Sequence, residues 1–258
     1  MLELKHWPLA SRVHIRGVLT DIDDTLTSHG QVSPDVVAAL GALKAAGLAV
    51  IAITGRPVGW SEPFANTWPI DAIVAENGAV ALRGQTKLYL QDAATRQTNQ
   101  HRMAQVAADI LQTMPQARLA QDSAGRETDI AIDHSEFAHL NEDEIAEVVR
   151  IMRAHGMTAT VSSIHINGWF GQHNKWLGAQ WVVREILGRD LQAELNHWVY
   201  VGDSANDVVM FEHFVHSVGV ANIAQCAHSL SHLPRYITQQ ERGAGFVELA
   251  RFLLAAKA

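Results

Sequence analysis

The sequence predicts an α/β fold, in which a Rossmann-like core built on a parallel sheet carries an inserted α+β cap domain. Short apolar runs alternate with helical patterns near both ends of the chain, and this order is typical of parallel sheets with right-handed crossovers. Between these two parts, residues 84–168 mix strands and helices in a different order. A chain of 258 residues is long enough for a core domain and a smaller second one. We therefore expect a core in residues 1–83 and 169–258 and a cap in residues 84–168.

The first part of the core alternates strands with a helix. Pro34 stands where the first turn of a helix accepts proline, and Gly47 stands where a helix commonly ends. Nearly continuous apolar runs predict strands that are buried on both faces. These expected strands cover residues 13–21, 48–54 and 71–76.

The insert begins where "VALRGQTKLYL" predicts a hairpin around Arg83-Gly84. The stripe from Met103 to Met114 predicts an amphipathic helix, which Pro115 ends. The expected elements that follow are a half-exposed strand over 128–133, a helix capped by Asn141 and Glu144, and two strands over 158–170.

The pattern of a parallel sheet resumes in the last part of the chain. Its expected elements are a helix over 174–188, strands over 197–203 and 216–222, and a last helix over 245–254.

Composition excludes several classes of protein. The formal charge is −7 and no basic cluster stands out, so a nucleic-acid partner is not expected. Cys226 is the only cysteine, which rules out an internal disulfide. No apolar stretch approaches the roughly 20 residues of a membrane span, and the first residues lack the apolar core of a signal peptide. We expect a cytoplasmic protein without a membrane partner, and its oligomeric state is left open.

Carboxylates gather at the ends of expected strands. Asp21 and Asp23 follow the first strand, and Asp203 and Asp207 follow a later one. Ligands of open parallel sheets bind at the carboxyl ends of the strands, so we expect these groups to meet in one pocket. Four carboxylates cannot all ionise there without a cation, and a set of oxygen ligands suits Mg²⁺.

Such a pocket is suited to phosphoryl transfer, which depends on charge neutralisation and in-line positioning. A metal ion together with Lys175 would neutralise a phosphate group. One carboxylate can take the phosphoryl group as an aspartyl-phosphate, and another can serve as general acid and base.

Four motifs resemble, in order, the signature motifs of the haloacid dehalogenase superfamily. They are "DIDDT" (21–25), "TGRP" (54–57), Lys175 in "HNKW" and "GDSAND" (202–207). "ENGA" (76–79) and "ERGAGF" (241–246) are similar to the subfamily IIB, Cof-type phosphatases, among them the sucrose-phosphate and mannosyl-3-phosphoglycerate phosphatases. In that subgroup the cap is an α/β insert between the second and third motifs, where residues 84–168 lie.

The resemblance implies a role for each matching residue. Asp21 would be the nucleophile and Asp23 the general acid and base. The phosphate-binding residues would be Thr54, Gly55, Arg56, Lys175 and Asn206, of which Thr54 and Lys175 also count as catalytic. The metal ligands would be Asp21, Asp23 through its backbone carbonyl, Asp203 and Asp207, with Asn206 near the same shell.

Some residues have two readings. Asp24 stands where the family usually has a small residue, and we assign it no catalytic role. Arg56 would either touch substrate or form a structural salt bridge. His165 and Asn167 are candidates for reading the substrate from the cap, whereas Trp169 and Phe170 are expected mainly to pack its hinge. The 14 histidines show no convincing zinc spacing.

The function implied is a magnesium-dependent phosphatase that hydrolyses a small phosphorylated metabolite, above all a sugar phosphate. Two alternatives stay open at this point. One is a sugar phosphomutase, which would need cap arginines that face the site. The other is a protein that binds a phosphorylated metabolite without catalysis.

Overall fold

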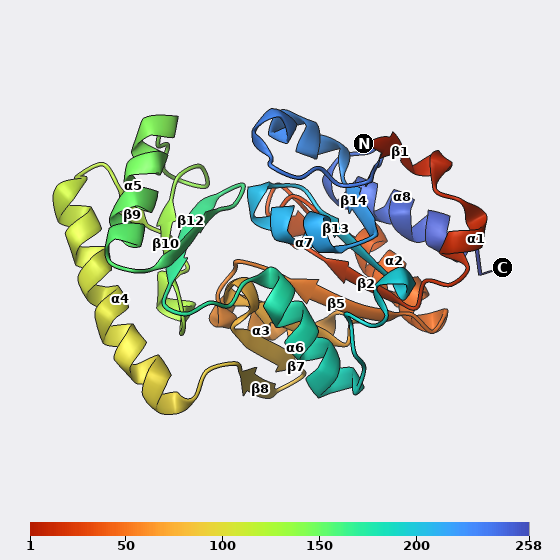
Figure 1. Ribbon diagram of the computed structural model, residues 1–258, viewed down its shortest axis with the longest axis horizontal. Helices are drawn as coiled ribbons and strands as arrows, with labels where there is room; N and C mark the ends of the chain where they lie inside the picture. The colour runs from red at the N-terminus through yellow and green to blue at the C-terminus, as the bar shows by residue number, and fades with distance from the viewer. Residues whose placement is uncertain (258) are drawn as a thin grey trace.

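The computed structural model describes residues 1–257, and a nine-stranded sheet forms its centre (Figure 1). In spatial order the strands are β1 (Leu2–Glu3), β15 (Tyr236–Ile237), β14 (His216–Gly219), β13 (Trp198–Gly202), β2 (Gly17–Thr20), β5 (Ala49–Ile53), β6 (Ala72–Ala75), β7 (Val80–Arg83) and β8 (Thr86–Tyr89). In this spatial order, the first seven strands, from β1 at the edge through β2 to β6, pair in parallel. The strands β7 and β8 add an antiparallel hairpin at the other edge. The expected α/β core with a parallel sheet is confirmed.

Helices cover both faces of the sheet because side chains of successive strand residues point to opposite faces. In β5, Val50 packs in the core on one face and Ile51 packs in the core on the other. The helices on the Val50 face are α2 (Pro34–Ala45), α3 (Val58–Thr67) and α8 (Arg242–Leu254). Those on the Ile51 face are α6 (Lys175–Leu187) and α7 (Val208–His213).

The boundaries of α6 matter because this helix carries Lys175 as its first residue. Asn174 caps its N-terminus, with the side-chain oxygen accepting the amide hydrogen of Leu177 at 2.9 Å. Gly188 ends it with φ +64°, a conformation that residues with a Cβ avoid. Its close packing depends on Gly178, because a Cβ there would lie 2.4 Å from the Cα of Gly78. The helix start is thereby fixed against the core.

A smaller unit lies beside the core (Figure 1). Its antiparallel sheet has the order β11 (Thr158–Val161), β12 (His165–Trp169), β10 (Ile130–Asp133) and β9 (Arg118–Leu119), and its helices are α4 (Ala93–Thr113) and α5 (Glu142–Ala154). The apolar stripe of α4 packs with α5 in a separate core that includes Met103 and Val148. The expected capping box of Asn141 and Glu144 is present at the start of α5.

The expected domain boundaries fall inside two structural elements. The boundary at 83/84 divides the hairpin β7–β8, although both strands belong to the large sheet. The boundary at 168/169 removes the last residue of β12 from the small sheet. The division of the chain into core and cap stays a proposal, and these pairings favour boundaries just after β8 and just after β12.

Several short elements differ from expectation. The strand expected over 13–21 is limited to β2, because the short helix α1 (Leu9–Arg12) and a turn precede it. The last helix begins at Arg242 rather than at 245. The helix α3 contains Pro63, which breaks most helices and therefore hides this one from pattern analysis. The hairpin of β3 (Thr27–Ser28) and β4 (Gln31–Val32) is too short to give a strand pattern.

Among residues 1–257, no helix is long and apolar enough to cross a membrane.

Candidate active site

The carboxyl ends of three neighbouring strands form the candidate site. The strand β2 lies between β13 and β5 in the sheet. Asp21 directly follows β2, Asp203 directly follows β13 and Thr54 directly follows β5. Because adjacent parallel strands end at the same edge, residues more than 150 positions apart in the sequence become neighbours. The structure thus brings the first, second and fourth motifs together.

Three buried carboxylates form the centre of the site. Asp21, Asp203 and Asp207 each offer an oxygen atom, and these oxygens all lie within 4.8 Å of one another. The three residues are 3%, 4% and 0% exposed. Negative charges held this closely and away from water repel strongly, so the cluster requires cations.

Lys175 supplies one cation. Its Nζ atom donates hydrogen bonds to Oδ1 of Asp21 at 2.5 Å and to Oδ1 of Asp207 at 2.6 Å. Burial alone would lower the pKa of Lys175, but the two carboxylates raise it above its ordinary value. The side chain therefore stays an ammonium ion although it is 2% exposed.

Asp207 is occupied by protein donors. Besides Lys175, its carboxylate accepts the hydroxyl of Tyr200 and the backbone amides of Asp203, at 2.9 Å, and Ser204, at 3.1 Å. This residue therefore fixes the loop after β13 and the Lys175 ammonium. Most of its lone pairs are already used for that purpose.

The other two carboxylates fit a divalent cation. Burial, and then the charges of Asp21 and Asp207, raise the pKa of Asp203 well above its ordinary value, which marks a shortage of positive charge. Asp203 receives only long hydrogen bonds, from Thr25 Oγ1 at 3.4 Å and Asn222 Nδ2 at 3.2 Å. Three carboxylates against one ammonium leave a formal excess of two negative charges, which a divalent cation would balance. Hard oxygen ligands of this kind suit Mg²⁺.

Asp23 lies beside this cluster but turns to a guanidinium group. Arg56 Nε donates to both of its carboxylate oxygens, at 3.0 and 3.1 Å. Burial raises the pKa of Asp23, and Arg56 opposes that shift. A carboxyl group with a raised pKa holds its proton more readily, which suits a general acid.

The same Arg56 also binds the smaller unit. Its Nη2 donates to Glu136 at 2.9 Å and its Nη1 to Asp122 at 3.3 Å. Glu136 in turn contacts the His165 ring nitrogen at 2.9 Å, and bonding to His165 and Arg56 lowers the pKa of Glu136 to about 2. Of the two readings of Arg56, a substrate contact and a salt bridge, the structure shows the salt bridge, which reaches both Asp23 and the cap.

The turn after β5 is covered by cap side chains. Thr54 accepts the amide hydrogen of Arg56 on its hydroxyl oxygen at 2.9 Å, so its own proton remains available to a ligand. The carbonyl of Gly55 accepts hydrogen bonds from Arg126 at 3.0 Å and from Asn167 at 3.4 Å. These contacts place the cap directly over the turn.

A buried glutamate ties the cap to the core behind this turn. Glu76 is fully buried and has φ +50°. Its carboxylate accepts the amides of Val58 on the core and of Glu127 and Thr128 on the cap, at 2.5 to 3.2 Å. Three backbone donors from both sides make Glu76 a clamp at the junction.

Other residues singled out from the sequence are held by contacts within the protein. Asn206 accepts the hydroxyl of Ser204 at 2.9 Å, which holds it within the loop. Trp169 and Phe170 are buried, and Trp169 donates to the His173 carbonyl, consistent with packing at the hinge. Cys226 is half-buried, with its thiol 3.5 Å from the Asp203 carbonyl, rather than fully buried as its apolar character suggests.

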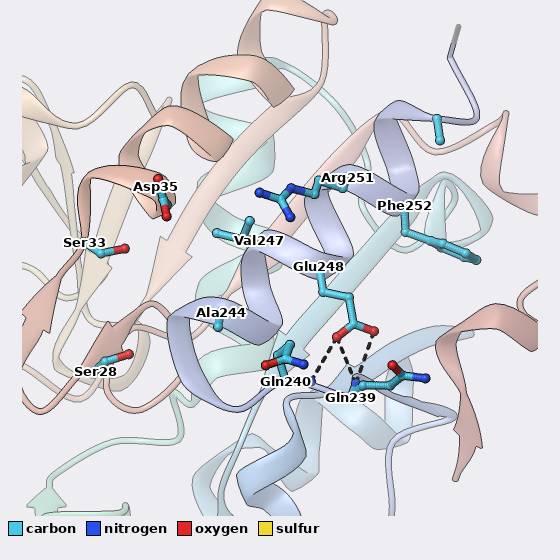
Figure 2. Close-up of a pocket in the computed structure, with 11 residues that line it drawn as sticks. Ser28, Ser33, Asp35, Gln239, Gln240, Ala244, Val247, Glu248, Arg251 and Phe252 are labelled. Carbon is cyan, nitrogen blue, oxygen red and sulfur yellow. Dashed lines mark hydrogen bonds between the residues drawn. The ribbon is translucent and has the colours of Figure 1, made fainter.

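Larger hollows lie elsewhere. One of about 690 Å³ runs along α8, and Figure 2 shows Glu248 in it, bonded to the backbone amides of Gln239 and Gln240. That carboxylate has a structural task, and none of the clustered carboxylates lines this hollow. The chemistry is therefore assigned to the edge of the sheet.

Sequence reasoning missed several residues of the site. Asn222 follows β14 at the same edge of the sheet and binds Asp203, so the rule that found Asp203 also applies to it. Glu136 and Asp122 stand in cap loops, and no local pattern connects them with Arg56.

Part of the chain matches a known family of proteins. Residues 18–121 match the family model of haloacid dehalogenase-like hydrolases. This match agrees with the expected resemblance to the haloacid dehalogenase superfamily. The matched haloacid dehalogenase-like segment contains the first two motifs, and Lys175 and "GDSAND" join them in space. No curated protein sequence matches the chain.

Several solved structures have the same fold as this chain. A protein from Thermoplasma acidophilum superposes with a TM-score of 0.71 at 14% identity, covering 93% of this chain and 98% of that one. The subclass IIB sugar phosphatase BT4131 gives 0.63 at 15% identity, covering 94% and 98%. The sucrose-phosphatase from Synechocystis sp. PCC6803, solved with sucrose and phosphate, gives 0.66 at 15% identity, covering 92% and 97%.

Proposed function

We propose that the protein is a magnesium-dependent phosphatase that hydrolyses a small phosphorylated metabolite, above all a sugar phosphate, through an aspartyl-phosphate on Asp21. One observation carries this proposal: Lys175 joins two of three clustered carboxylates beside Thr54, at the ligand-binding edge of the sheet. The family match supports a hydrolase. The sugar-phosphate substrate is suggested by the names of the neighbours BT4131 and sucrose-phosphatase.

In the first half of the reaction, a carboxylate oxygen of Asp21 attacks phosphorus and the bond to the leaving oxygen breaks. Asp23 gives its proton to that oxygen, and the leaving group departs as an alcohol. Lys175 and the Thr54 hydroxyl neutralise charge on the phosphoryl oxygens, the main requirement of phosphoryl transfer.

In the second half, Asp23 takes a proton from water, and the water oxygen attacks phosphorus. The bond between phosphorus and Asp21 breaks, inorganic phosphate leaves and the carboxylate is restored. Arg56 holds Asp23 for both proton transfers, and the cap above Gly55 limits the access of other water.

Asp21 and Asp203 would hold the metal ion, with the backbone carbonyl of Asp23 beside them and Asp207 fixing their loop. When bound, Mg²⁺ supplies charge neutralisation for the phosphate.

Phosphate release tests the proposal. Native protein with Mg²⁺ should release inorganic phosphate from sugar phosphates, and EDTA should stop release reversibly. Asp21→Asn should keep the fold but lower turnover by at least a thousandfold, whereas Asp35→Asn on the exposed start of α2 serves as the matched control. Full activity of Asp21→Asn, or turnover in EDTA, would refute the mechanism.

The structure favours hydrolysis over the phosphomutase alternative. Most of the cap arginines bind cap residues or stack on aromatic rings, for example Arg102 over Phe170 and Arg150 on Glu147. Arg126 reaches the core but contacts the Gly55 carbonyl and buried carboxylates. Free phosphate, rather than an isomeric sugar phosphate, is the expected product. A protein that binds without turnover would release neither.

A further inference from the structure

A hollow of about 450 Å³ opens beside Asp23 and Arg56, between the core and a cap loop. It is smaller than the hollow on α8, but it reaches the proposed general acid. Because Asp23 would protonate the leaving oxygen, the leaving group has to lie on this side of the site. The residues around the hollow therefore meet the part of the substrate that distinguishes one phosphate ester from another.

The charges of this hollow are already paired. Arg56 is bound to Asp23 and to Glu136. The second guanidinium, that of Arg242, has its Nε 3.1 Å from Oδ1 of Asp24. The lining thus contains three carboxylates and two guanidinium groups, each of the latter facing at least one carboxylate. A second anionic group on a ligand would meet no unpaired cation here.

The core side of the hollow is held in an unusual backbone conformation. Asp24, His29 and Arg242 have φ angles of 52°, 53° and 54°, a region that residues with a Cβ seldom adopt. All three line this hollow. Strained backbone of this kind persists where surrounding contacts impose it, and it commonly marks a functional site.

Asn222 imposes part of this conformation. Its amide nitrogen donates to the carbonyl of Asp24 at 3.1 Å and to Asp203 at 3.2 Å, and its oxygen accepts the amide of Arg242 at 2.9 Å. The Arg242 side chain also lies 3.3 Å from a ring nitrogen of His29. One buried amide therefore connects the proposed metal ligand with both members of the Asp24–Arg242 pair.

We propose that Asp24, His29 and Arg242 form a core-borne specificity element that binds the hydroxyl groups of an uncharged, polyhydroxylated leaving group. This inference rests on the proposed phosphatase function and deepens it. Carboxylate oxygens accept from hydroxyl groups, and guanidinium nitrogens donate to them, so a paired Asp24 and Arg242 suit a neutral polyol. Phe137 also lines the hollow, and its 63% exposure leaves an apolar ring for the carbon face of such a group.

The test compares phosphate esters in matched pairs. Each sugar or sugar-alcohol monophosphate is assayed beside the corresponding phosphosugar acid or bisphosphate, with p-nitrophenyl phosphate as an ester without aliphatic hydroxyls. For native protein, kcat/KM should be at least tenfold higher for the neutral member of each pair. Preference for the acid or bisphosphate would overturn the inference.

The variants Asp24→Asn and Arg242→Gln test the residues themselves. Each should lower the ratio of kcat/KM for the best sugar phosphate to that for p-nitrophenyl phosphate at least tenfold, mainly through KM. Arg251→Gln, an exposed arginine of the same helix, is the matched control and should keep the native ratio. Thermal unfolding verifies that each variant is folded. His29→Gln, at an exposed position, gives a further test and should lower the same ratio of kcat/KM values about threefold.

The outcomes separate the two proposals. If every variant is folded and hydrolyses p-nitrophenyl phosphate but the ratio does not move, the specificity element is wrong and the phosphatase function stands. If native protein with Mg²⁺ releases no phosphate from any ester, the phosphatase function fails and this inference fails with it.

Discussion

Replacing Lys175 with methionine should destabilise the folded chain strongly. The Nζ atom lies 2.5 Å from Asp21 and 2.6 Å from Asp207, and the side chain is 1% exposed. Removing one partner of a buried ion pair leaves uncompensated charge and costs about 3–5 kcal/mol. Methionine fills a similar volume, so little of this cost comes from a cavity. At about 2–4 °C per kcal/mol, the expected fall in Tm is roughly 6–20 °C.

Lys44→Met is the matched control. Lys44 also forms an ion pair, with Asp71 at 2.6 Å, but its side chain is 32% exposed. Exposed pairs contribute about 0–1 kcal/mol, so Tm should fall by no more than about 4 °C.

Circular dichroism during heating, in EDTA and at several pH values, measures both variants. In Lys175→Met the orphaned carboxylates regain a neutral form by protonation, so the deficit relative to native protein should shrink from pH 8 to pH 5. A Lys175→Met variant that loses no more stability than Lys44→Met, or whose deficit is the same at every pH, would contradict a role for Lys175 in neutralising these buried carboxylates.

Three further changes test other parts of the structure. Burial lowers the pKa of His173 from 6.5 to about 4, so the folded state resists protonation and loses stability as pH falls from about 6.5 towards 4. In His173→Gln, Tm should depend less on pH over that range, and a Tm that changes with pH as in the native protein would contradict this. Gly178→Ala should lower the free energy of unfolding, measured by urea titration, by more than about 2 kcal/mol, because the added Cβ meets the backbone of Gly78. Gly41→Ala is the control: its added Cβ has no neighbour closer than 3.7 Å, so the free energy of unfolding should rise by roughly 0.5–1 kcal/mol. Glu76→Gln turns an acceptor of three backbone amides into a weaker one and should speed proteolysis at the core–cap junction; cleavage at the native rate would remove Glu76 as the clamp.

The sheet edge could be predicted from the sequence because its logic is local. Three of the apolar runs end in a residue whose side chain can react or bind a ligand. Parallel strands place their carboxyl ends at the same edge of the sheet. Asp21, Thr54 and Asp203 follow that rule, so their convergence needed no knowledge of side-chain packing. Lys175 does not follow a strand. The strand-end rule therefore does not point to it; the family resemblance assigns its role, and the Asn174 cap explains its position at the start of α6.

The contacts between core and cap could not be predicted in the same way. Glu136 lies 80 positions from Arg56, in a loop whose place depends on how two separate apolar cores settle against each other. No periodicity connects the two residues. Asp24 shows the same limit, because the sequence indicates an extra charge, and its partner Arg242 stands more than 200 positions away.

Backbone strain gives a view of the site that is independent of charge. Among residues 1–257, five residues other than glycine have positive φ. Three line the hollow beside Asp23, and the other two, Glu76 and Asn77, lie behind the Thr54 turn, where Asn77 donates its amide to the Thr54 carbonyl at 2.9 Å. Glycine would adopt these angles at lower cost, so the strained backbone is kept at these positions for the sake of their side chains. Strain, buried charge and the core–cap contacts therefore mark one region, which is the region where the proposed function places the phosphate ester.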